Sequence, residues 1–145
     1  MDNMNSYYSR ALSDLRYAEG GMTVGEKYGD FNNVAVLCVQ AGEKFLKAIF
    51  ELAFAEDSSC ADLMTTHNLR TLCNKINTKY TLIVSSRDCK WLGDFYLEAS
   101  YPGKNFVVVS EKDALEYLAL AKQIKEDTDR ILAEIQKERD EMRVF

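Results

Sequence analysis

Hydrophobic residues recur every three or four positions along most of the chain, and this spacing predicts α-helices. The first helix is expected over 6–19, with Ser6 as its N-cap and the pair Gly20-Gly21 as its end. Asp30 is expected to cap a long second helix over 31–55, about 37 Å long at 1.5 Å per residue, which would form the backbone of the domain. One apolar stripe of this helix contains Ala41, Phe45, Ala48, Ile49 and Leu52.

The second half of the chain predicts three more helices. After a loop over 56–62, a third helix is expected near 67–78, and a fourth over 86–100 begins at a capping-box pattern on Ser85 and Asp88 and stops at Pro102-Gly103. The apolar segment 106–109 is interpreted as a packed connector, because no second strand is evident to pair with it. Ser110 caps a last helix whose apolar face continues to at least residue 135.

These elements predict an all-α fold, an antiparallel up-and-down bundle of four or five helices. At 145 residues the chain fits one domain, over 1–136, and 137–145 is expected to be a charged helical extension or a frayed tail. No apolar run is long enough to span a membrane, and the N-terminus lacks a signal-peptide pattern, so we expect a cytoplasmic protein.

The sequence contains few residues that could bind a metal or a cofactor. Four cysteines (Cys38, Cys60, Cys73 and Cys89) form no C-x-x-C pair, and His67 is the only histidine, so we expect reduced thiols and no metal site. No glycine-rich phosphate loop is present, and no cofactor is expected.

Charge is distributed unevenly. The chain has a net charge of −5, but segment 68–104 carries six Lys or Arg against three Asp or Glu. Four of these cations form a candidate patch for anions or nucleic acid: Arg70, Lys75, Arg87 and Lys90. The same segment carries aromatic residues that could stack on bases, namely Trp91, Phe95, Tyr96 and Tyr101. The alternative is that the cations are solvated helix faces and the aromatics belong to the core and to interfaces.

Three polar residues are candidates for a groove. Glu43 and Lys47 stand four positions apart on the second helix, an orientation that favours an ion pair. His67 is a candidate for a catalytic role, because histidine is the side chain whose charge changes near neutral pH, and the alternative is that it helps to order the start of the third helix. The alternative for Glu43 and Lys47 is a structural ion pair without a ligand.

Four motifs resemble HEPN domains over residues 7 to about 135. The second-helix stretch 40–48 reads QAGEKFLKA, close to the family's Gln-Ala-Ala-Glu-Lys-Ala-Leu-Lys-Ala. The stretch 66–72 reads THNLRTL, similar to the Thr-His-Asp-Leu-x-x-Leu that opens the family's third helix. The stretch 96–103 reads YLEASYPG, similar to Tyr-x-x-Ala-Arg-Tyr-Pro, and SEKDA at 110–114 resembles the start of the final helix.

One departure from the family pattern bears on activity. HEPN ribonucleases carry an Arg followed four to six residues later by a His, and the Arg aligns with Ser100 here, with no His downstream. RNA cleavage needs a general base and a positive charge at the phosphorane. In the motif-equivalent region (Ser100, Tyr101, Pro102, Lys104 and Asn105), Lys104 could replace the cation, but no residue replaces the base.

The resemblance therefore implies a non-catalytic binding or dimerisation module. It also implies a homodimer with the Tyr-Pro region near the two-fold axis, and a nucleotidyltransferase partner of the toxin–antitoxin type. One alternative is a divergent ribonuclease that uses Ser100, Lys104 and Asn105 with residues of a second subunit. Another is a structural interaction protein without a ligand. Any binding of a nucleotide or RNA is expected to be weak and salt-sensitive, because the flanking segments are acidic.

Overall fold

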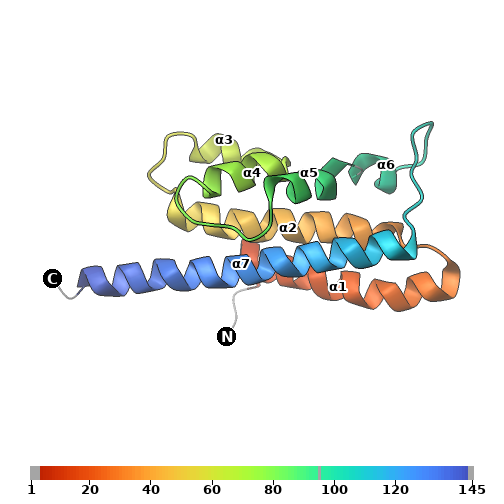
Figure 1. Cartoon of the computed structure of the whole chain (residues 1–145), viewed down its shortest axis with the longest axis horizontal. Helices are drawn as coiled ribbons and strands as arrows, with labels where there is room; N and C mark the ends of the chain where they lie inside the picture. Colours follow the sequence, from red (N-terminus) through yellow and green to blue (C-terminus); the bar gives the residue numbers. More distant parts are fainter. Residues whose placement is uncertain (1–3, 95, 144–145) are drawn as a thin grey trace.

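The computed structural model describes residues 4–94 and 96–143, which contain helices and no β-strand. Figure 1 labels the seven helices of these residues. They are α1 (Tyr7–Tyr28), α2 (Asn32–Ala53), α3 (Cys60–Thr65), α4 (Leu69–Ile76), α5 (Ser86–Asp94), α6 (Tyr96–Ser100) and α7 (Glu111–Arg143). The predicted all-α fold is confirmed, and α3 and the separate α5 and α6 add short helices to it.

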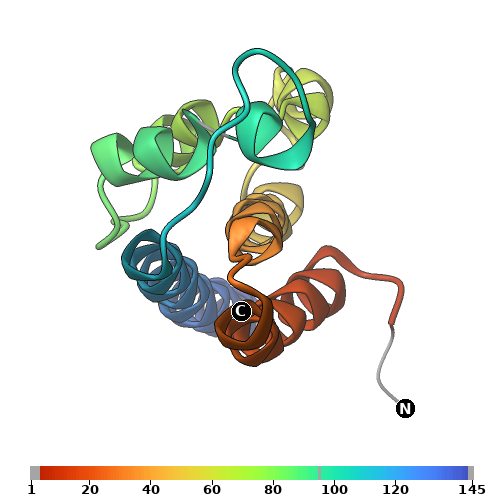
Figure 2. The ribbon, with the colours of Figure 1, turned by 90° about the vertical axis from the view of Figure 1, so that its right-hand side faces the viewer.

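The helices form an up-and-down bundle with α2 at its centre (Figures 1 and 2). Helix α1 runs antiparallel to α2, the row α4–α5–α6 returns along the other side, and α7 closes the bundle. Because α2 contacts all six other helices, it is apolar on most of its circumference, and its buried residues include Phe45, Leu46, Ile49 and Phe50. The exception is Leu52, which was expected on the buried stripe but is 41% exposed.

The predicted end of the first helix at Gly20-Gly21 is wrong. Helix α1 continues to Tyr28 and ends at Gly29, whose φ of 69° is the left-handed conformation of a helix C-cap. A glycine inside a helix costs only about 1 kcal/mol, which tertiary packing can offset. At Gly25 a Cβ would lie 2.4 Å from the Phe31 ring, so this glycine lets the start of α2 approach α1 closely.

Other boundaries differ by a few residues from the prediction. Helix α3 lies partly in the predicted loop, and α4 is shorter than the expected 67–78 because its N-cap is Asn68, whose side chain accepts the Thr71 N–H. The expected placement of Phe95 on the fourth helix falls outside the described residues. Helix α7 continues past residue 135 to Arg143 and projects beyond the bundle (Figure 1). The domain boundary at residue 136 stays a prediction.

Two polar side chains fix the long connections to the bundle. The buried carboxylate of Asp127 on α7 accepts the backbone N–H groups of Ile83 and Val84, each at 3.0 Å, and so holds the α4–α5 connection. The buried Asn32 at the start of α2 holds the α6–α7 connection. Residues 106–109 form no helix or strand, as expected of a connector, but the expected packing is only partial, because Val109 is buried while Phe106 and Val108 are exposed.

Candidate functional site

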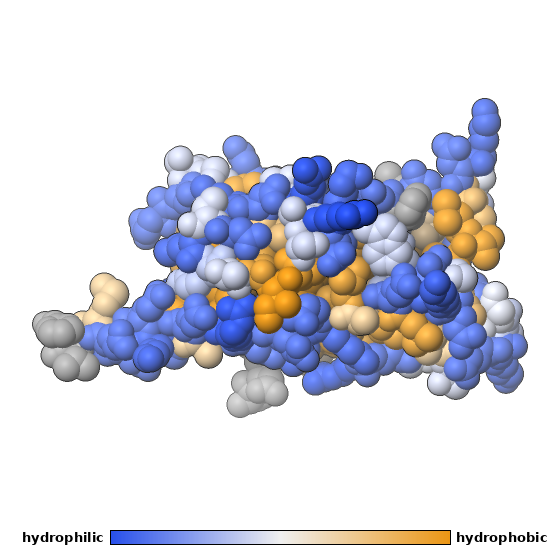
Figure 3. Space-filling view, in the orientation of Figure 1, coloured by the Kyte–Doolittle hydropathy of each residue, from blue (hydrophilic) through white to orange (hydrophobic). Residues whose placement is uncertain are grey.

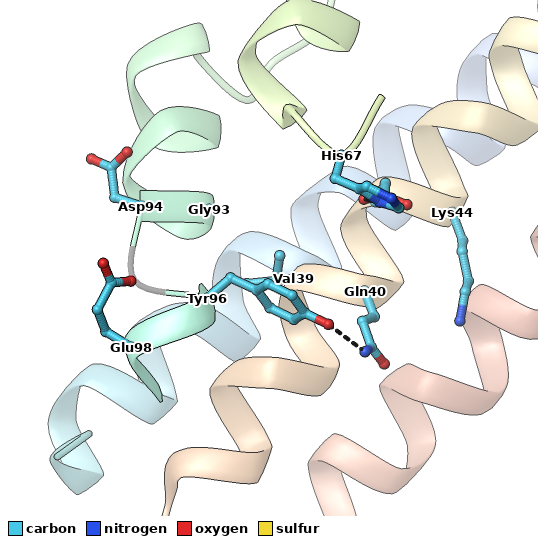
Figure 4. Close-up of a pocket in the computed structure, with 9 residues that line it drawn as sticks. Val39, Gln40, Lys44, His67, Gly93, Asp94, Tyr96 and Glu98 are labelled. Atoms are coloured by element: carbon cyan, nitrogen blue, oxygen red, sulfur yellow. Dashed lines mark hydrogen bonds and ion pairs between the residues drawn. The ribbon is translucent and has the colours of Figure 1, made fainter. Parts of the chain in front are cut away.

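A cleft of about 540 Å³ opens between α2 and the row α5–α6, and the linker before α4 covers one side of it (Figure 4). Its size lies within the range of about 300–1,000 Å³ that is typical of small-molecule sites. Helix α2 supplies one wall, and residues from Gly93 onward supply the other. The lining residues are Val39, Gln40, Glu43, Lys44, His67, Gly93, Asp94, Tyr96 and Glu98.

The inner wall of the cleft contains a charged network centred on Glu43. One carboxylate oxygen of Glu43 lies 3.2 Å from Lys47 Nζ, and the other lies 2.9 Å from His67 Nδ1. Lys47 is only 4% exposed and stands behind Glu43, whereas the side chain of His67 is 84% exposed. The structure therefore brings the three predicted groove residues together, with Glu43 and His67 at the surface of the cleft.

Tyr96 crosses the cleft toward α2. Its hydroxyl accepts a hydrogen bond from Gln40 Nε2 at 3.0 Å, as Figure 4 shows. The carboxylates of Asp94 and Glu98 stand at the rim, on the wall opposite His67 (Figure 4). Gly93 contributes bare backbone between them and the floor of the cleft. These residues give the cleft an aromatic, hydrogen-bonding interior and an acidic rim.

The motif-equivalent region lies next to this cleft, at the end of α6. The Ser100 hydroxyl donates to the backbone oxygen of Tyr96 within the same helix. The segment that follows lines a shallow depression of about 270 Å³, to which Tyr101, Pro102, Lys104 and Asn105 contribute. Glu98 lines both this depression and the cleft, so the two sites share one wall.

Asn32 anchors the connection that carries this region. Its side-chain Nδ2 donates to the backbone oxygens of Ala99 at 3.1 Å and Val107 at 2.7 Å, and its Oδ1 accepts the Val109 N–H at 2.8 Å. Both ends of the 100–108 connection are therefore fixed to the start of α2. These hydrogen bonds restrict the conformations that the connection can adopt.

The HEPN domain profile matches residues 4–131 of the 145-residue chain. The chain belongs to the HEPN domain family. The resemblance predicted from its sequence motifs is thereby confirmed. The comparison with curated proteins found no match, and neither did the comparison with solved structures.

The predicted basic patch of this HEPN domain is divided among three places. Arg70 and Lys90 line a small pocket of about 330 Å³ beside the cleft, and Lys90 Nζ lies 2.9 Å from Asp94 in it. Lys75 pairs with Asp57 at 2.8 Å, and its ammonium holds the pKa of that carboxyl well below its usual range. Arg87 lines a separate groove between α5 and α7. Carboxylates thus neutralise two of the four cations, and the four do not share one pocket.

The aromatic residues of the same segment are also separated. Trp91 stacks on Tyr117 of α7 with ring centroids 4.6 Å apart, and burial raises the pKa of Tyr117. Tyr96 lines the cleft, and Tyr101 is exposed on the α6–α7 connection. The rings of Trp91, Tyr96 and Tyr101, which the structure describes, therefore do not form a continuous stacking platform.

The described residues contain free cysteines and no grouping of three or more acidic, Cys or His side chains suited to a metal ion. Burial raises the pKa of Cys38 to about 12, so this thiol stays protonated at neutral pH. Over the same residues, no helix is both long and apolar enough to cross a bilayer.

Several site residues were not predicted from the sequence. Asn32 has a weak local signal, since Asp30 was expected to cap the second helix. That expected cap is wrong, because the N-cap of α2 is Phe31, although Asp30 Oδ1 accepts the Asn32 N–H at 3.1 Å. Gly93 and Glu98 carry no motif, and Gln40 lies inside the family signature without a predicted role. Their place in the cleft depends on how α5 and α6 face α2, which no local pattern encodes.

Proposed function

We propose that this HEPN domain is a non-catalytic binding module that forms homodimers through the α6–α7 connection and acts beside a nucleotidyltransferase. The observation that carries the proposal is the chemistry at the end of α6. The family position for the catalytic Arg holds Ser100, whose hydroxyl is used inside its own helix. The only histidine of the chain, His67, lies in the linker before α4 and lines the cleft.

RNA cleavage requires two groups near one phosphate, and the motif-equivalent region supplies only one of them. A general base must take the proton of the attacking 2′-hydroxyl, and a cation must stabilise the charge of the phosphorane. Lys104 supplies a cation in the motif-equivalent region, but neither Asn105 nor Phe106 accepts a proton at neutral pH. A binding role explains these residues better than hydrolysis does.

Exposed apolar side chains on the connection support dimerisation. Tyr101 is 65% exposed, Phe106 48% and Val108 74%. Figure 3 shows hydrophobic side chains gathered at the end of the molecule where this connection runs. Exposed apolar patches mark interaction surfaces, and a second copy presents the same patch across a two-fold axis. Asn32 fixes the patch, which lowers the entropy cost of association.

Sedimentation velocity at tens of micromolar tests the dimer. We expect the unmodified protein to sediment as a dimer and the Val108→Asp variant to sediment as a monomer, because a charge is buried without a partner. Ile83→Asp is the matched control, since Ile83 is 70% exposed on the distant α4–α5 connection. A monomeric unmodified protein, or a dimeric Val108→Asp variant, would contradict the proposed interface.

A cleavage assay with structured and unstructured RNA tests the non-catalytic assignment. We expect no cleavage above the level of a blank purification. Cleavage that Ser100→Ala or Lys104→Ala abolishes would instead establish a divergent ribonuclease. The partner is tested by co-purification with the product of the adjacent coding sequence, if that sequence encodes a minimal nucleotidyltransferase.

A further inference from the structure

We infer that the cleft beside His67 binds an organic cation, an ammonium or guanidinium group carried on a small aromatic or aliphatic body. The proposed dimer surface on 101–108 lies next to this cleft, and Glu98 lines both the cleft and the depression on that connection. The inference depends on three features of the cleft: its shape, the glycine in its wall and the balance of its charges.

The basic side chains that line the cleft, Lys44 and the imidazole of His67, already contact carboxylates of the protein. Lys44 Nζ lies 2.6 Å from Asp14 of α1, and His67 pairs with Glu43. Glu43 also contacts the buried Lys47. An anionic ligand would have to compete with these carboxylates for each cation.

The carboxylates at the rim are less well compensated. Asp94 pairs with Lys90 at 2.9 Å, in an ion pair whose side chains are both more than 40% exposed. Glu98 is half-buried and has no ion-pair partner among residues 4–94 and 96–143. With His67 uncharged, Lys44, Lys47 and Lys90 each have a carboxylate partner, and the charge left over in the cleft is the single negative charge of Glu98. A ligand cation at the rim would neutralise it.

Gly93 leaves space in the wall of the cleft, and the fold does not require a glycine at this position. It lies inside α5 and is not among the described glycines with positive φ, and an added Cβ would meet only Leu69 Cδ1, at an ordinary 3.7 Å. Gly93 is the penultimate residue of α5, and neither a positive φ nor a close contact requires a glycine there. Its bare backbone forms part of the cleft wall. Glycine at such a place allows a ligand to approach the main chain.

The interior of the cleft fits the body of the ligand. Val39 offers an apolar surface, and the ring of Tyr96 offers a face for packing. The Tyr96 hydroxyl, which accepts from Gln40, keeps its own proton to donate. A ring or short chain placed there would carry its cationic end toward Glu98 at the rim.

Titration of ¹⁵N-labelled full chain at pH 7.5 tests the inference with two matched probes. Tyramine carries a primary ammonium on a phenol, and tyrosol carries a hydroxyl in place of the ammonium. We expect tyramine to shift the amide signals of Gly93 and Tyr96 and to bind at least tenfold tighter than tyrosol. Equal affinity for the two probes, no shift with tyramine up to 10 mM, or tighter binding of AMP at the same amides would overturn the inference.

Two pairs of variants locate the site. Glu98→Gln should lower tyramine affinity at least tenfold, while Glu126→Gln on the exposed face of α7 should not change it. Gly93→Leu should remove binding of both probes with helical content intact, while Gly20→Leu, at an open position of α1, should retain it. If Gly93→Leu does not fold, Gly93→Ala replaces it and should weaken both probes. Unchanged tyramine affinity in Glu98→Gln or in the folded Gly93 variant would refute the site.

A third probe identifies the source of the cation. The peptide acetyl-Gly-Lys-Gly-amide presents an ammonium on a protein-like side chain. Binding as tight as that of tyramine would indicate a basic side chain of a partner, and binding of tyramine alone would indicate a free amine. Both outcomes support the cation site. The Val108→Asp variant should bind tyramine like the unmodified protein, so the two proposals can fail separately.

Discussion

Replacing Asn32 by alanine should destabilise the protein and detach the connection that carries the proposed interface. The side chain makes three hydrogen bonds to backbone groups of Ala99, Val107 and Val109. Each is worth about 1 kcal/mol, and leaving the buried Val109 N–H unpaired adds a cost within the range of about 1–3 kcal/mol. Part of these terms overlaps, and we expect a total loss of about 3 kcal/mol in the free energy of unfolding.

Urea denaturation followed by circular dichroism measures this loss, with Asn33→Ala as the matched control. Asn33 occupies the same first turn of α2 but is exposed, so its replacement should change stability by less than about 0.5 kcal/mol. Hydrogen exchange at Val107 and Val109 should also accelerate in Asn32→Ala. A difference below about 1 kcal/mol between the two variants would show that water replaces the three hydrogen bonds, and would refute the reasoning.

Other predictions test packing and ionisation. Gly42→Ala should destabilise the protein by about 1–3 kcal/mol in urea denaturation, because its Cβ would lie 3.1 Å from Ile124 and 3.2 Å from Leu69; Gly20→Ala, with open space, should stabilise it. Burial raises the pKa of Tyr8 in the folded protein. The protonated Tyr8 hydroxyl therefore contributes fully to stability below the unfolded pKa of about 10. This contribution is lost as the pH rises further, because the unfolded chain then loses the proton more readily than the folded one, and the urea midpoint should fall above pH 10. At pH 8 a thiol reagent should label the half-buried Cys60 rapidly, and the three buried thiols only on unfolding; rapid labelling of more than one thiol would contradict this.

Sequence patterns predicted the helices best where the signal is local. Ser6, Ser85 and Ser110 were expected caps, and each hydroxyl accepts a backbone N–H three residues later. A helix cap depends only on residues close in sequence, so it can be predicted from the local sequence pattern. The glycines of α1 were misread because their reason lies elsewhere: Gly25 accommodates Phe31, which reaches it only after the chain has turned.

In the candidate site, too, local contacts could be predicted from the sequence, whereas contacts between distant segments could not. The Glu43–Lys47 pair follows from helical spacing, but its contact with His67 crosses 24 positions and depends on how α4 is placed. The basic patch was inferred from the total charge of a segment, which does not say where a side chain points. In the fold, Arg87 lines the groove between α5 and α7, whereas Arg70 lines the small pocket beside the cleft. The packing of α4–α6 on α2 determines the direction in which each of these basic side chains points.

The central position of α2 has a consequence for the order of folding. Helices α1 and α2 are joined by a short turn and share the most extensive contacts of any pair, so they can associate without closing a long loop. Helix α7 reaches the same core only after the segment 54–110 has been placed. A transition state built on the α1–α2 hairpin would give high φ-values at Ala18 and low ones at Ile124. Core substitutions in α7 would then act mainly by speeding unfolding.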